Sequence, residues 1–108
     1  FGGQMVSWMD ISASKAVHRF LKESDADAAL TRAIDAIEFK ETVEVGDWVN
    51  FEANIISVGN SSIVINIDAF KESNNTDKTL ACTARFTFVS VKKNKFGIYE
   101  KVNHKQKI

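Results

Sequence analysis

The spacing of apolar residues predicts one long helix at the start of the chain. Between Gln4 and Leu21 apolar side chains recur every three or four residues, which is the period of an amphipathic helix. This stripe contains Met5, Trp8, Met9, Ala13, Ala16, Val17 and Phe20. Asp10 falls at one margin of the stripe on a helical wheel. The polar segment 22–28 that follows predicts a loop.

After this loop the apolar period changes to two, which is typical of half-buried antiparallel strands. Four segments show this period: Thr31–Phe39, Trp48–Val58, Ile63–Phe70 and Thr79–Val91. Their apolar faces are Ala33, Ile37 and Phe39; Val49, Phe51, Ala53 and Ile55; Ile63, Ile65, Ile67 and Ala69; and Leu80, Cys82, Ala84, Phe86 and Phe88. The glycines in 46–47 and 59–62 predict turns, the second closing a hairpin, and 71–78 predicts a polar loop.

One long helix followed by four strands predicts an α+β domain in which a curved antiparallel sheet wraps around the helix. The 108 residues suffice for a single domain of this kind. We place the domain in residues 1–91 and expect residues 92–108 to form a basic tail, a solvated and partly disordered end. Such a sheet leaves one edge open, and a second copy could pair with it, so we expect a homodimer.

The charge of the chain excludes a general attraction to polyanions, because its formal net charge is zero. Residues 92–108 carry six lysines against the single acid Glu100, and the rest of the chain has eight basic and thirteen acidic residues. The aromatic residues interleave with the predicted strands as core positions, so no nucleic-acid surface is indicated. No apolar run approaches the roughly 18 residues that a membrane span requires.

Cys82 is the only cysteine, which excludes a disulfide within the chain and fits a reducing, cytoplasmic location. Its place in an apolar strand pattern indicates a buried, inert thiol. His18 and His104 are far apart in the pattern, and no Cys or carboxylate cluster joins them. We therefore assign no metal and no cofactor.

The start of the predicted helix combines two glycines with an acid. Gly2 and Gly3 leave backbone N–H groups open to a ligand, and the helix dipole favours negative charge there. Those groups can stabilise an oxyanion. Asp10, beside the apolar stripe, could deprotonate a water as general base or attack a carbonyl as nucleophile. The pattern leaves both roles open, and a tight turn with an ordinary exposed helix acid is the alternative interpretation.

The run Phe1-Gly2-Gly3-Gln4 with Trp8-Met9-Asp10, followed by Ala-x-x-Ala and an arginine, resembles the acyl-CoA thioesterases of the hotdog fold. Later stretches match that family in the same order, namely Thr31–Phe39, Val45–Asp47, Val58–Ile63 and Phe86–Val89. The resemblance extends to about Val91. It is greatest to acyl-CoA hydrolases that act on medium or long chains, including the brain-type and YciA-like enzymes.

The resemblance implies a hotdog domain that forms a homodimer or a trimer of dimers, with active sites at the dimer interface. It implies that the substrate is a medium- or long-chain acyl-CoA, hydrolysed to free fatty acid and CoA in fatty acid metabolism. Asp10 matches the catalytic carboxylate of the family, and the Gly3 N–H faces the thioester oxygen. In the family a further strand and an Asn-x-x-Gly stretch precede the Phe-Gly-Gly, so we expect both upstream of Phe1.

Further residues could bind the substrate. In the family the hairpin turn matching Gly59, Asn60, Ser61 and Ser62 lies near the CoA phosphates, and backbone N–H groups and short hydroxyls suit phosphate oxygens. Arg85 and Arg32 could also meet the phosphates, and Thr31 could line the site. A plain hairpin turn and solubilising arginines are the alternative interpretations.

Two other functions are compatible with the same fold. One is a non-catalytic hotdog domain that binds acyl-CoA or regulates another protein without cleaving the thioester. The other is a dehydratase, which generally pairs a histidine with an acid on or near the helix. The start of this helix offers no suitable histidine, so we rank the dehydratase last.

Overall fold

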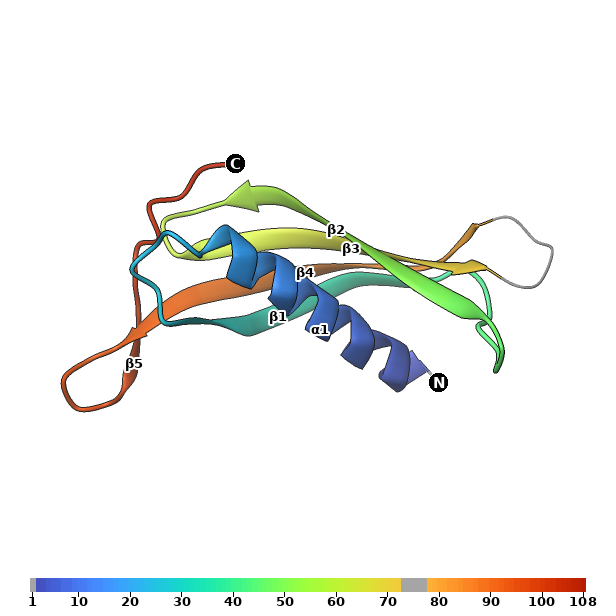
Figure 1. Cartoon of the computed structure of the whole chain (residues 1–108), viewed down its shortest axis with the longest axis horizontal. Coiled ribbons are helices and arrows are strands. Elements are labelled where there is room, and N and C mark those ends of the chain that lie inside the picture. Colours follow the sequence, from blue (N-terminus) through green and yellow to red (C-terminus); the bar gives the residue numbers. More distant parts are fainter. Residues whose placement is uncertain (1, 73–77) are drawn as a thin grey trace.

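A computed structural model describes residues 2–72 and 78–108 as one helix lying across a curved antiparallel sheet (Figure 1). The elements in chain order are α1 (Gly2–Phe20), β1 (Ala28–Phe39), β2 (Trp48–Val58), β3 (Ser62–Glu72), β4 (Thr79–Lys93) and β5 (Tyr99–Lys101). The strand order is β1-β4-β3-β2, with the short β5 paired to β4. This arrangement confirms the predicted α+β architecture, in which the sheet wraps around the helix.

The apolar stripe of α1 is narrower than the sequence predicted. Its fully buried residues follow a four-residue spacing, namely Met5, Met9, Ala13 and Val17. Trp8, predicted to belong to the stripe, is 37% exposed. It lies next to Met9 in sequence, which places it about 100° around the helix from the buried line. The helix also begins at Gly2 rather than Gln4, so both glycines belong to its first turn.

The three strands β2, β3 and β4 bear out the two-residue period. Residues Ile63, Ile65, Ile67 and Ala69 of β3 and Cys82, Ala84, Phe86 and Phe88 of β4 are buried. The predicted face of β2 is half-buried and packs against the same core. The polar loop predicted at 71–78 is wrong for Lys71 and Glu72, because these residues continue β3 in register with β2. The rest of that predicted loop, 73–77, lies outside the described residues, as does Phe1.

The edge strand β1 departs most from its predicted pattern. Its register against β4 shifts between Thr31 and Ala33 and again between Asp35 and Glu38, and Ala36 has a left-handed φ of 50°. Each inserted residue moves the following side chains to the other face of a strand. On the helix side lie Thr31, Ile34 and Phe39, opposite Phe88, Phe86 and Cys82 of β4. The prediction that Ala33, Ile37 and Phe39 share one face is therefore wrong.

The segment after β4 folds back onto the domain. β5 pairs with the end of β4, and the Val102 N–H donates to the Ser90 carbonyl. His104 is buried and lies against the β2–β3 turn, where its Nε2 is 3.2 Å from the Ser62 carbonyl oxygen. Residues 92–104 therefore pair with β4 and with the β2–β3 turn, while nearly all side chains of 92–101 are exposed to solvent, as the basic composition predicted.

Candidate functional site

The structure brings Asp10 of α1 and Thr31 of β1 together. The Thr31 hydroxyl donates a hydrogen bond of 2.8 Å to Oδ1 of Asp10. Thr31 points toward the helix because it stands opposite the buried Phe88. The carboxyl group of Asp10 is half-buried at the margin of the apolar stripe. A carboxylate oxygen that accepts one hydrogen bond is oriented, and the group keeps further lone pairs for a water or a substrate.

Gly2 and Gly3 lie in the first turn of the same helix, seven to eight residues before Asp10. Seven residues correspond to about 10 Å along a helix axis, and helical side chains lean toward the N-terminus, so the Asp10 carboxylate reaches toward Gly3. The first-turn N–H groups of a helix have no partner within it. The structure describes every residue of this first turn, and none of them is acidic. It can therefore offer donors to a negatively charged oxygen.

The two glycines differ in their surroundings. A Cβ atom at Gly2 would lie 3.3 Å from Cζ of Phe39, so the ring of Phe39 packs directly on that glycine. A Cβ atom at Gly3 would meet no described atom within 4 Å. The N-terminal turn is thus closed on the Gly2 side and open on the Gly3 side.

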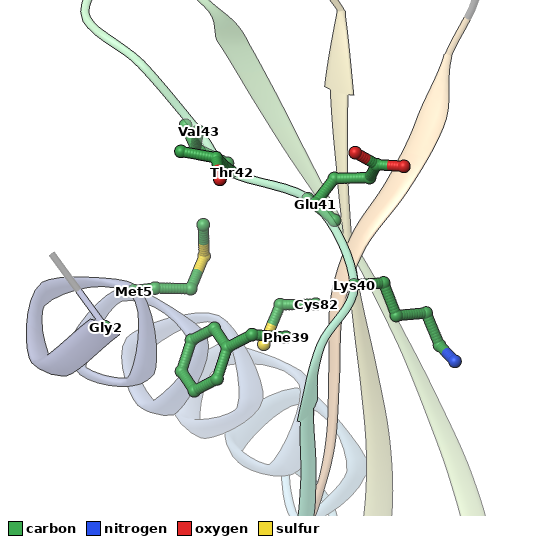
Figure 2. Close-up of a pocket in the computed structure, with 9 residues that line it drawn as sticks. Gly2, Met5, Phe39, Lys40, Glu41, Thr42, Val43 and Cys82 are labelled. Carbon is green, nitrogen blue, oxygen red and sulfur yellow. The ribbon is translucent and has the colours of Figure 1, made fainter.

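A cavity of about 370 Å³ adjoins this turn (Figure 2). Its lining residues are Gly2, Met5, Phe39, Lys40, Glu41, Thr42, Val43, Ala81 and Cys82. Figure 2 shows the Phe39 ring beside the first turn of α1, whereas the side chains of Lys40 and Glu41 point away from the helix. Segment 40–43 could not be predicted as part of a site, because its mixed polar and apolar residues follow neither period.

Cys82 lies on the wall of this cavity but carries no reactivity. Its side chain is fully buried, and burial raises the pKa of the thiol above its ordinary value of 9.0. The thiol is therefore protonated at neutral pH, and a protonated thiol is neither a nucleophile nor a metal ligand. This confirms the predicted buried, inert cysteine. Among residues 2–72 and 78–108, no three His, Cys, Asp or Glu side chains stand close enough to hold a metal ion.

The turn formed by Gly59, Asn60, Ser61 and Ser62 lies at the other end of α1. Its Asn60 carbonyl accepts from the His104 N–H, and the ring of His104 packs edge-on against Phe20, the last residue of α1. Phe20 is ten residues from Asp10, or about 15 Å along the helix. Within one chain the structure therefore does not bring this turn to Asp10, and its contact with CoA phosphates stays a prediction.

Arg85 also lies away from Asp10 in a single chain. It is exposed on the sheet face opposite α1, in register with Asp35 of β1 and Asn66 of β3. Arg32 is exposed on β1. Their predicted phosphate contacts remain predictions.

The two elements that carry Asp10 and Thr31, α1 and β1, also carry exposed apolar side chains. They are Trp8, Ile11, Leu30, Ile34, Ile37 and Phe39, and we call them the β1 edge surface. β1 ends the strand order of the described sheet, so one side of its backbone lacks a strand partner there. An open strand edge lined with apolar residues is typical of an interface.

No helix in the described part of the chain has the length and apolarity of a membrane span.

A family model described as the thioesterase superfamily matches residues 1–78. An uncharacterised acyl-CoA thioester hydrolase of Buchnera aphidicola subsp. Acyrthosiphon pisum is 35% identical over 99 residues, which cover 90% of this chain and 70% of that protein.

Solved structures show the same fold. A hexameric thioesterase from Yersinia pestis is 30% identical, with a TM-score of 0.79. The match covers 94% of this chain and 79% of the Yersinia chain. A hexameric hotdog fold thioesterase of Campylobacter jejuni is 25% identical, with a TM-score of 0.76. The match covers 95% of this chain and 76% of the Campylobacter chain. These similarities confirm the hotdog fold that the sequence motifs implied.

Proposed function

Since the chain belongs to the thioesterase superfamily, we propose that it hydrolyses the thioester bond of acyl-CoA with Asp10 as its catalytic carboxylate. It is a hydrolase by family, and its Buchnera relative carries the name acyl-CoA thioester hydrolase. The observation that carries the assignment to Asp10 is the 2.8 Å hydrogen bond from Thr31, which orients a half-buried carboxylate beside an apolar surface.

In the proposed reaction the thioester carbonyl lies between Asp10 and the first turn of α1. The Gly3 N–H donates to the carbonyl oxygen, whose negative charge grows as the carbon becomes tetrahedral. Asp10 either takes a proton from the attacking water or attacks the carbonyl itself to form a mixed anhydride that water then cleaves. In both routes the carbon–sulfur bond breaks, and the products are a carboxylic acid and the CoA thiol.

We propose that the cavity beside Gly2 receives part of the acyl chain. Met5, Phe39 and Val43 line it with hydrocarbon, and burial of each methylene group of an acyl chain contributes about 0.8 kcal/mol. An apolar cavity next to the proposed oxyanion site supports a preference for medium- or long-chain substrates. Comparing kcat/KM over a series of acyl-CoA chain lengths tests this preference.

The proposed active site includes a second copy of the chain. Pairing through the β1 edge surface would cover Asp10 and Thr31, and the Yersinia and Campylobacter relatives are hexameric, which is compatible with a trimer of dimers. Because Gly59–Ser62 and Arg85 lie away from Asp10 in one chain, we propose that they contact CoA bound at a neighbouring protomer. An Ile34→Asp variant is expected to yield monomers in analytical ultracentrifugation and to lose turnover.

The decisive experiment is Asp10→Ala, followed by release of the CoA thiol from a panel of acyl-CoAs. Turnover is expected to disappear while the melting temperature and CoA binding stay near those of the wild type. Asp25→Ala, in the exposed loop after α1, is the matched control and should retain full activity. Wild-type rates in Asp10→Ala would refute the assignment. Acyl-CoA binding without thiol release by the wild type would instead identify a non-catalytic binding domain.

Incorporation of ¹⁸O into Asp10 would identify this residue as the nucleophile. In a single turnover in H₂¹⁸O with excess enzyme, a nucleophilic carboxylate acquires ¹⁸O when water attacks its side of the anhydride, whereas a general base does not. Mass spectrometry of the peptide that contains Asp10 measures this incorporation.

A further inference from the structure

The hairpin between β4 and β5 projects beyond the rest of the sheet (Figure 1). We propose that this hairpin tip, defined as residues 92–101, docks the protein on the surface of an anionic lipid bilayer. The proposal rests on three independent properties of the tip, which are its exposed apolar side chains, its backbone hydrogen bonds and its charge.

The apolar side chains of the tip are strongly exposed. Phe96 is 75% exposed, Ile98 is 61% exposed and Tyr99 is 44% exposed. Three large apolar residues are thus exposed within four positions of a protruding loop, and exposed apolar groups gathered in one place typically mark an interaction site. Their side chains can enter another apolar medium without any rearrangement of the fold.

Several backbone groups of the tip are paired by hydrogen bonds within the loop. The Asn94 N–H donates to the Ile98 carbonyl at 2.9 Å, and the Gly97 N–H donates to the Asn94 carbonyl at 3.0 Å. Oδ1 of Asn94 accepts from the N–H groups of Phe96 and Ile98 at 2.8 and 3.1 Å. Gly97 permits this tight loop through its left-handed φ of 77°. Backbone groups that are paired in this way lose no hydrogen bond when the loop leaves water, which is the main requirement for entering lipid.

The charge of the tip identifies the kind of surface. It carries four exposed lysines, Lys92, Lys93, Lys95 and Lys101, against the single acid Glu100. Oε1 of Glu100 accepts a hydrogen bond from the Asn94 side chain at 2.6 Å, so this carboxylate is held inside the loop. Lysines beside exposed apolar side chains are typical of segments that bind anionic headgroups and insert apolar groups beneath them.

The same observations disfavour two other partners. Two copies of the tip would repel each other, because each has an excess of three positive charges. Stacking of nucleic-acid bases needs free aromatic faces. Here the ammonium groups of Lys93 and Lys95 lie 5.4 Å and 5.2 Å from the ring centres of Tyr99 and Phe96.

Vesicle co-sedimentation of the full chain tests the proposal. The wild type should bind vesicles of phosphatidylcholine with phosphatidylserine, bind pure phosphatidylcholine much more weakly, and release from the mixed vesicles as salt is raised. Phe96→Ser with Ile98→Ser should weaken binding at least about tenfold, since two large apolar side chains no longer insert. Lys95→Gln with Lys101→Gln should weaken it about twenty-five-fold, at about fivefold per lysine near an anionic surface.

The matched control for charge is Lys15→Gln with Lys22→Gln, which removes two exposed lysines at α1 and should leave vesicle binding unchanged. Circular dichroism melting and turnover of a water-soluble acyl-CoA should be the same in all variants, because the tip residues lie outside the core. Failure of the wild type to bind mixed vesicles, or equal binding by the tip variants, would overturn the proposal. Tip-dependent binding of a single-stranded RNA oligonucleotide without vesicle binding would also overturn it, as would tip-dependent self-association without vesicle binding.

Discussion

Replacing Thr31 with Val removes the hydroxyl that donates to Oδ1 of Asp10 and keeps a β-branched side chain of nearly the same shape. A hydrogen bond to a charged group contributes about 1.5–3 kcal/mol net. Thr31 is exposed in a single chain, so we take the lower end, about 1.5 kcal/mol. If the bond orients Asp10 for attack, kcat should fall about tenfold with little change in KM.

Steady-state release of the CoA thiol measures kcat and KM for the wild type, Thr31→Val, Asp10→Ala and the double variant. Two groups that act as one unit are non-additive. Thr31→Val should therefore have no further effect on the residual rate once Asp10 has become alanine. The melting temperature should fall by several degrees at most, because the lost hydrogen bond also stabilises the fold whereas valine and threonine suit an edge strand equally well.

Thr83→Val is the matched control. The Thr83 hydroxyl donates to Oδ1 of Asp68 at 2.6 Å on the outer face of the sheet, so this variant also breaks a Thr–Asp hydrogen bond between two strands. It should leave kcat unchanged. Equal losses in Thr31→Val and Thr83→Val would show a general effect on the sheet. A Thr31→Val enzyme with wild-type kcat would refute the orienting role of the hydrogen bond.

Four further variants test the packing of the domain. Gly3→Ala should raise the melting temperature more than Gly2→Ala, because a Cβ at Gly3 meets no described atom within 4 Å whereas a Cβ at Gly2 would lie 3.3 Å from Cζ of Phe39, whose ring would have to shift. Burial raises the pKa of the Cys82 thiol in the folded state. The protonated thiol therefore contributes its full stability below pH 9.0, the ordinary thiol pKa, and this contribution is lost as the pH rises through the higher folded-state pKa. Urea unfolding should accordingly show a smaller loss of stability at alkaline pH in Cys82→Ala than in the wild type. His104→Ala should destabilise the fold by about 2–3 kcal/mol in chemical denaturation, because it leaves a buried cavity and an unpaired carbonyl.

The parts of the fold with a regular period could be predicted from the sequence. The buried residues of β3 alternate strictly from Ile63 to Ala69, and the predicted face of β4 from Cys82 to Phe88 is buried, because both strands have the helix on one side. Met5 to Val17 follow the helical period for the same reason. β1 could not be predicted in this way. It has a strand on one side only, so its bulges and the left-handed Ala36 cost little, and they reversed the faces that alternation assigned.

The candidate site was predictable only as a set of residue types. Gly2, Gly3 and Asp10 share one helix, so their spacing in sequence fixes their spacing in space. The partnership of Asp10 with Thr31 depends on the register of β1, which local sequence does not determine. The fold of residues 92–104 was missed because its lysines indicate solvent, whereas its contacts come from distant groups such as the Ser62 carbonyl.

The pairing of β1 has a consequence for how the chain reaches its native state. Among the described strands β1 pairs with β4 alone, and its partners begin at Cys82. During synthesis on the ribosome, α1 and β1 therefore emerge long before the strand that joins them to the rest of the sheet. Contacts between residues so distant in sequence slow folding, and an apolar strand edge that stays exposed until its partner strand is made is prone to aggregation. Nascent chains halted before residue 82 should thus remain protease-sensitive and bind chaperones, whereas chains extended past β4 should become resistant.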